Sequence, residues 1–176
     1  MNWLRSRSPA ESTANDSELP ATGTKSRLKK ILVATDFSEC SRKALDYATS
    51  LGRQFNAELI ILHVIEAMPP QFRIVEAMLM ENSLHDEAVH QLQEWSAHLG
   101  PEVKVTTVLR EGSPASKEIV EVAKQLEADL VVIGNHGRKA LERRLMGNTA
   151  ERVVRFAPCP VLVIKETERD FVSRCE

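Results

Sequence analysis

Two polar segments of this sequence carry residue types that could hold a phosphorylated ligand. Asp36 follows the apolar run at residues 30–35, and Gly134 follows the apolar run at residues 129–133. Gly137 comes three positions after Gly134 and Gly147 ten positions after that, so three of the seven glycines lie within 14 residues. Glycine permits positive φ angles and lets backbone N–H groups approach a ligand closely. A helix predicted to begin at Asn148 would add free N–H groups and a positive dipole end, which favour an anion.

Each of these features also has a simpler interpretation. The glycines could serve only turns, and Asp36 or Ser38 could cap the helix that follows. As a ligand residue, Asp36 could accept hydrogen bonds from ribose hydroxyls or from an adenine amino group. Arg138, next to the second glycine, could reach a phosphate. The position of Asp36 opposite the glycine segment favours ligand binding over capping.

The remaining sequence predicts the framework that brings the two segments together. Short apolar runs alternate with stretches of helical periodicity, which is typical of parallel α/β proteins. We predict an open, Rossmann-like parallel sheet of five strands in the order 3-2-1-4-5, with helices on both faces. Ligands of such sheets bind where strands 1 and 4 diverge. The predicted strands are residues 30–35, 57–65, 103–109, 129–133 and 161–164.

Four helices are predicted between these strands. The first covers residues 38–54, and the last covers residues 148–156, with Asn148 and Glu151 as a capping box. Ser83 is predicted to open the second helix after a mobile apolar segment at residues 66–82. Ser113-Pro114 is predicted to cap the third helix.

Composition sets the domain organisation and the protein class. The 176 residues, 43% hydrophobic and 27% charged, predict one globular domain at residues 27–165. Residues 1–26 and 166–176 are predicted as a disordered N-terminal tail and a polar C-terminal tail. A net charge of −2 argues against a nucleic-acid partner. Three cysteines without a CxxC pair suit a reducing compartment. No apolar run is long enough for a membrane span or a signal peptide. We therefore expect a cytoplasmic protein without a membrane partner.

Several other chemistries fit the sequence less well. It contains no P-loop motif, and its glycines follow the fourth predicted strand, which argues against a P-loop NTPase or a dehydrogenase. His85 and His90 are five residues apart, about 140° around a helix, and so make a poor zinc pair. The basic cluster of Arg138, Lys139, Arg143 and Arg144 is interpreted either as a solvated loop or as a group that attracts phosphate, with a nucleic-acid patch less favoured. We find no nucleophile elbow, so no catalytic residue is predicted and we expect no dedicated enzyme, although slow ATP hydrolysis stays open.

In combination, these motifs resemble the universal stress protein family. The resemblance is carried by residues 31–38, residues 128–134, the Gly-x2-Gly-x9-Gly pattern and Ala-Pro-Cys-Pro-Val-Leu-Val at residues 157–163. It covers Lys29 to Lys165. It implies an adenine-nucleotide-binding module that forms homodimers and acts in stress response or signalling.

The resemblance also implies roles for individual residues. Asp36 would lie near the ribose, with Ala34 and Thr35 at the same strand end, and Val64 would meet the adenine through its backbone. Asn148 stands where ATP-binding members usually have Ser or Thr, so ADP and AMP are alternatives to ATP, and Mg²⁺ could accompany the nucleotide. The residues expected to hold the phosphates are Gly134, Gly137, Arg138, Gly147, Asn148 and Thr149.

We therefore favour a module that acts through nucleotide-dependent conformation and dimerisation. The predicted strand Val161 to Ile164 is an apolar sheet edge, and such edges tend to be paired, here with a second copy of the chain. Two alternatives stay open. One is an interaction protein that has kept the fold without the nucleotide, and the other is a slow ATPase or nucleotidyl-transfer enzyme.

Overall fold

The computed structural model describes residues 28–66, 75–137 and 146–165, with the backbone alone for residues 75–82. Its strands are β1 (Lys30–Thr35), β2 (Glu58–Ile65), β3 (Val105–Glu111), β4 (Leu130–Gly134) and β5 (Val161–Ile164). They form one parallel sheet in the order β3-β2-β1-β4-β5. The predicted fold class and strand order are confirmed. The two predicted tails, Arg138 and the rest of the basic cluster lie outside the described residues.

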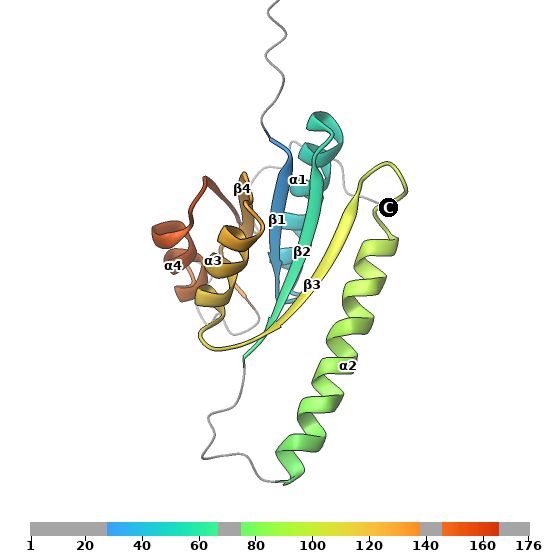
Figure 1. The fold of residues 1–176 in the computed structure, drawn as a ribbon, viewed down its shortest axis with the longest axis vertical. Helices are drawn as coiled ribbons and strands as arrows, with labels where there is room; N and C mark the ends of the chain where they lie inside the picture. Colours follow the sequence, from blue (N-terminus) through green and yellow to red (C-terminus); the bar gives the residue numbers. More distant parts are fainter. Residues whose placement is uncertain (1–27, 67–74, 138–145, 166–176) are drawn as a thin grey trace, which may run out of the picture.

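Two helices cover each face of the sheet (Figure 1). Helices α1 (Glu39–Phe55) and α2 (Val75–Ala97) lie on one face, and α3 (Ala115–Gln125) and α4 (Asn148–Phe156) lie on the other. None of the described helices is long and apolar enough to cross a membrane.

The central strand β1 is buried on both sides, as its continuous apolar run predicts. Ile31 and Val33 pack beneath α1 and α2, whereas Leu32 and Ala34 pack beneath α3 and α4. Ile31, Leu32 and Val33 are fully buried. Each such side chain contributes about 1.5–3 kcal/mol through its burial. The strand is thereby fixed, and so is the position of the polar residues at its carboxyl end.

Two helices begin differently from the sequence prediction. Helix α2 begins at Val75, so the capping box predicted at Ser83 is wrong. Residues 76–81 are mostly strong helix formers and extend the helix upstream, which makes Ser83 an exposed interior residue. The segment predicted to be mobile at residues 66–82 is therefore helical from Val75 onward, and residues 67–74 lie outside the described part. Helix α3 has Pro114 as its N-cap without a side-chain bond, so Ser113 does not cap it.

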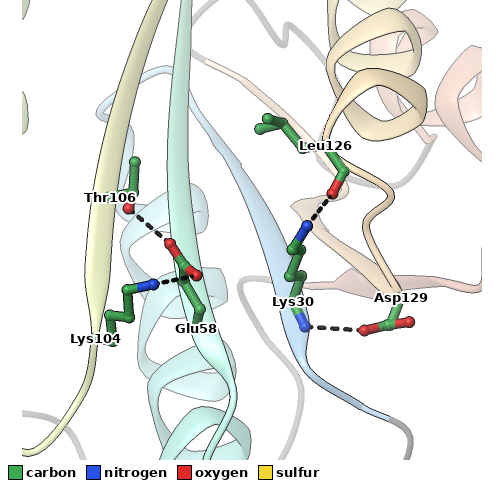
Figure 2. Close-up of polar contacts among 6 residues, drawn as sticks. All are labelled: Lys30, Glu58, Lys104, Thr106, Leu126 and Asp129. Atoms are coloured by element: carbon green, nitrogen blue, oxygen red, sulfur yellow. Dashed lines mark hydrogen bonds and ion pairs between the residues drawn. The ribbon is translucent and has the colours of Figure 1, made fainter.

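At the amino ends of the strands, one carboxylate joins β1 to the start of β4 (Figure 2). Asp129 Oδ2 accepts hydrogen bonds from the backbone N–H groups of Lys29, at 2.8 Å, and Lys30, at 2.9 Å. The Lys30 Nζ atom donates to the carbonyl oxygen of Leu126 at 2.9 Å. These contacts tie the loop before β4 to the central strand.

A second polar group joins β2 to β3 at the same end (Figure 2). Glu58 Oε2 lies 2.8 Å from Lys104 Nζ, and Glu58 Oε1 accepts a hydrogen bond from Thr106 Oγ1, also at 2.8 Å. The bonds from Lys104 and then from Thr106 hold the pKa of the Glu58 carboxyl below its usual value. The polar groups at this end of the sheet pair with one another and stabilise the fold.

Candidate functional site

The opposite end of the sheet contains the predicted ligand site. Strands β1 and β4 are paired in parallel with Ala34 opposite Ile133, so Asp36 and Asn135 follow the two strands at the same edge. The chain continues from β1 into α1 on one face and from β4 toward α4 on the other. This divergence is the switch point at which open α/β sheets bind ligands.

The carboxylate of Asp36 is held by the residue that caps α1. Asp36 Oδ1 accepts hydrogen bonds from Ser38 Oγ at 2.6 Å and from the Ser38 backbone N–H at 3.2 Å. Ser38 is the N-cap of α1, and its side chain accepts from the Ser41 N–H. The capping interpretation therefore applies to Ser38, whereas Asp36 orients the cap. This arrangement fixes the carboxylate at the end of β1.

The second oxygen of Asp36 packs against the glycine segment. A Cβ atom built on Gly137 would lie 2.6 Å from Asp36 Oδ2, closer than real Cβ contacts allow. Residue 137 must therefore be glycine if Asp36 is to keep this position. The contact joins the two polar segments across the switch point, as their positions in the sequence predict.

The third glycine begins the helix that faces this edge. Gly147 is the N-cap of α4, without a side-chain cap bond, and Asn148 is the first helical residue, so the predicted capping box at Asn148 is wrong. The first helical hydrogen bond runs from the Glu151 N–H to the Gly147 carbonyl. The preceding amides, those of Asn148 and Thr149 among them, are not bonded by a capping side chain, and both residues are exposed. An uncapped helix N-terminus attracts anions.

The N-terminus of α3 lies at the same edge, but it is occupied by a carboxylate. The Ala115 N–H donates a hydrogen bond to Glu66 Oε1 at 3.2 Å. Glu66 directly follows β2, and its negative charge is well placed at the positive end of α3. An anionic ligand is thus directed away from α3 and toward α4.

The family model of the universal stress proteins matches residues 27–165 of this chain. The chain belongs to the universal stress protein family. A universal stress protein of Methanocaldococcus jannaschii is 36% identical over 149 residues, which cover 81% of this chain and 85% of the relative. Among solved structures, the universal stress protein UspA from Lactobacillus plantarum is 28% identical with a TM-score of 0.65, covering 80% of this chain and 99% of that one. A universal stress protein in complex with cAMP is 27% identical with a TM-score of 0.56, covering 81% and 100%.

In this universal stress protein, the residues predicted at the site fall into two groups. Asp36, Gly137, Gly147, Asn148 and Thr149 all lie at the open edge. Of the other predicted residues that the structure describes, two pack in the core and two face α1. Ala34 is buried in the core beneath α3 and α4, and Val64 packs against the same core.

Two predicted residues face α1. Thr35 Oγ1 lies 3.0 Å from Ser41 Oγ and accepts from the Phe37 N–H at 2.9 Å, so its side chain organises the start of α1. A Cβ on Gly134 would lie 2.9 Å from Cys40 Sγ, which explains the glycine by close packing of β4 on α1. Their roles toward a ligand stay predictions.

Sequence reasoning missed Phe37, which directly follows Asp36 in the turn before α1. Its φ angle is 61°, in the left-handed region that large side chains rarely adopt. Its ring centroid lies 4.4 Å from that of His63, whose Nδ1 atom is 2.8 Å from the Thr35 carbonyl oxygen. The Phe37 ring also meets the Trp95 ring edge-on at 5.4 Å. Because phenylalanine does not favour positive φ, nothing in the sequence marks this turn.

The cavity and the possible metal ligands of the described residues lie away from the glycine segment or do not form a cluster. A cavity of about 310 Å³ opens between α1 and α2, lined by Phe37, Arg42 and Trp95 among others, and includes none of the three glycines. No group of three or more metal-ligating side chains occurs in this part of the chain. His85 and His90 each lie near a separate carboxylate, of Glu111 and Glu94.

Proposed function

We propose that this universal stress protein binds an adenine nucleotide at the carboxyl ends of β1 and β4. ATP is the expected ligand, and ADP and AMP are the alternatives. The contact of Asp36 Oδ2 with Gly137, beside the uncapped N-terminus of α4, carries the proposal. The cAMP complex of a related family member supports the class of ligand.

The charges at this edge suggest how the nucleotide would be oriented between α4 and β2. The phosphates would lie at the N-terminus of α4, because Glu66 already occupies the N-terminus of α3. The ribose would lie at Asp36, whose carboxylate accepts hydrogen bonds from hydroxyl groups. The base would then extend toward the end of β2 at Val64.

Asn148 is expected to determine which phosphates are recognised. It is exposed at the first position of α4, where its side-chain amide can donate a hydrogen bond to a phosphate oxygen. Unlike Ser or Thr, it has no hydroxyl to offer to a nucleotide-bound Mg²⁺. An Asn148→Ser variant should therefore gain affinity for ATP in the presence of Mg²⁺ relative to AMP.

We further propose that the protein works as a homodimeric binding module of the stress response and not as a dedicated enzyme. Strand β5 lies at the edge of the sheet and is apolar throughout. Just before it on α4, Val154 and Phe156 are 48% and 60% exposed. A second copy of the chain would cover this apolar edge, as exposed strand edges favour.

Calorimetric titration with ATP, ADP and AMP, each with and without Mg²⁺, tests the proposed ligand. Binding with micromolar affinity is expected for at least one of them, and an Asp36→Ala variant should lose most of it. If the folded wild-type protein released no heat and gained no thermal stability with any nucleotide, the proposal would be wrong and the pure interaction module would be favoured. Light scattering tests the dimer, which a monomer at tens of micromolar would contradict.

A further inference from the structure

Asn135, the residue directly after β4, is a buried polar residue at the centre of the glycine segment. It is 8% exposed, and both its backbone and its side chain are hydrogen-bonded. A buried amide is costly unless its donors and acceptors are satisfied, so such a residue fixes the groups around it.

The backbone of Asn135 connects three elements. Its N–H donates to the carbonyl oxygen of Ile164, at the end of β5, at 2.7 Å. Its carbonyl oxygen accepts from the Gly147 N–H, also at 2.7 Å, and a Cβ on Gly147 would lie only 3.1 Å from that oxygen. The N-cap of α4 is therefore attached directly to the residue that leaves β4.

The side chain of Asn135 fixes the orientation of this peptide. The Cys40 thiol, on the first turn of α1, lies 3.3 Å from Asn135 Oδ1 and 3.4 Å from the Ile164 carbonyl oxygen, so its single proton is shared between these two acceptors. Asn135 Nδ2 lies within hydrogen-bond distance of His136 Nε2, at 3.0 Å. Because the amide is held on both sides, the carbonyl that binds Gly147 cannot turn freely.

We infer that Asn135 is a positioning residue that sets where the N-terminus of α4 lies relative to Asp36. Asp36 is anchored to α1 through Ser38, and Asn135 is anchored to the same turn of α1 through Cys40. Through its own carbonyl oxygen, Asn135 then fixes the position of Gly147 relative to α1. Since the inference rests on the proposed nucleotide site, Asn135 governs the affinity for the phosphates and has little effect on the affinity for the nucleoside.

The test compares adenosine with the phosphorylated adenosine that the wild type binds most tightly, titrated against each variant. Asn135→Ala should reduce the preference for the phosphorylated ligand at least about tenfold and change the affinity for adenosine less than about threefold. Cys40→Ala should act in the same direction more weakly, and Cys40→Ser, which keeps a donor for Asn135 Oδ1, should restore the preference.

A matched control separates positioning from a general loss of stability. Thr49 is fully buried in α1 and donates to the Leu45 carbonyl at 2.7 Å, away from the glycine segment. Thr49→Val removes a buried side-chain hydrogen bond within α1 and should leave the phosphate preference unchanged. If Asn135→Ala weakened adenosine and the phosphorylated ligand by the same factor, or if the wild type showed no preference for phosphate, the inference would be overturned.

Hydrogen exchange provides a readout that needs no nucleotide. The Gly147 amide should exchange at least about tenfold faster in Asn135→Ala than in the wild type, while the amides of β1 keep their protection. If no variant or wild-type protein bound any nucleotide, the proposed function would fail by itself. In that case an unchanged Gly147 exchange rate would also refute the positioning role, whereas faster exchange would support it.

Discussion

The steric contact between Gly137 and Asp36 allows a quantitative test of the proposed site. In a Gly137→Ala variant the new Cβ would lie 2.6 Å from Asp36 Oδ2. Relief to an ordinary contact, which begins at 3.4 Å, requires the two atoms to separate by about 0.8 Å or more. Asp36 cannot yield that distance easily, because Ser38 holds its other oxygen through two hydrogen bonds, from its side chain and its backbone.

The substitution should therefore impair binding much more than folding. Gly137 is exposed and its φ lies outside the left-handed region, so alanine is compatible with the backbone. The reduced entropy of the unfolded chain would offset much of the steric cost, and we expect stability within about 1 kcal/mol of the wild type. A displaced Asp36 loses a charge-assisted hydrogen bond to the ribose, which is equivalent to about 1.5–3 kcal/mol, or a 10- to 100-fold weaker affinity.

A double-mutant cycle measured by calorimetry decides whether this mechanism is correct. Asp36→Ala removes both the hydrogen bond and the atom that clashes, so adding Gly137→Ala to it should cost almost nothing further. Gly112→Ala is the steric control, because its Cβ would also lie 2.6 Å from a side chain, but from the flexible Glu118. Additive losses in the double variant, or wild-type affinity in Gly137→Ala, would refute the reasoning.

Three further predictions concern the fold and the dimer. The lowered pKa of Glu58 means that its contribution to stability is present at pH 7 and is lost as pH falls below the ordinary value of about 4.5. In urea unfolding, Lys104→Met should lower the free energy of unfolding by about 0.5–1 kcal/mol at pH 7 and make it fall less steeply at acidic pH. An unchanged dependence on acidic pH would contradict the role given to Lys104. Phe37→Gly relieves backbone strain but loses the ring contacts and adds unfolded-chain entropy, so urea unfolding should show a net loss of about 2 kcal/mol; a stabilised variant would refute this balance. Phe156→Asp should make the protein monomeric by light scattering without altering its unfolding midpoint, and a persistent dimer would place the interface elsewhere.

The sequence was sufficient to predict the framework because burial determines it. The central strands β1 and β4 are apolar runs, and a parallel sheet covered on both faces can bury them, which left few possible topologies. Helix starts were harder to predict. The patterns at Ser83, Ser113 and Asn148 each resemble a cap, yet a cap exists only if the backbone before it leaves the helix, and that depends on the neighbouring residues in space.

At the site, the sequence could predict which segments meet but not what each side chain contacts. The pairing of Asp36 with the glycine segment follows from strand order alone. In contrast, the sequence does not show that Gly134 packs on Cys40 whereas Gly137 packs on Asp36. These contacts depend on which element faces each glycine. The left-handed backbone of Phe37 had no sequence signal, since its stability comes from ring contacts with residues far along the chain.

The two ends of the sheet use polar groups differently, and this difference supports the proposed position of the nucleotide. At the amino ends, carboxylates are matched by amides, hydroxyls and ammonium groups from neighbouring elements, as Asp129 and Glu58 show. At the carboxyl ends, Asp36 is held rigidly through one oxygen while the other packs against a backbone without a side chain, beside a helix terminus that no side chain caps. A carboxylate and a positive helix end at the same edge of the sheet would suit a ligand that has hydroxyl groups on one side and negative charge on the other. A nucleotide has both, because its ribose carries the hydroxyls and its phosphates carry the charge.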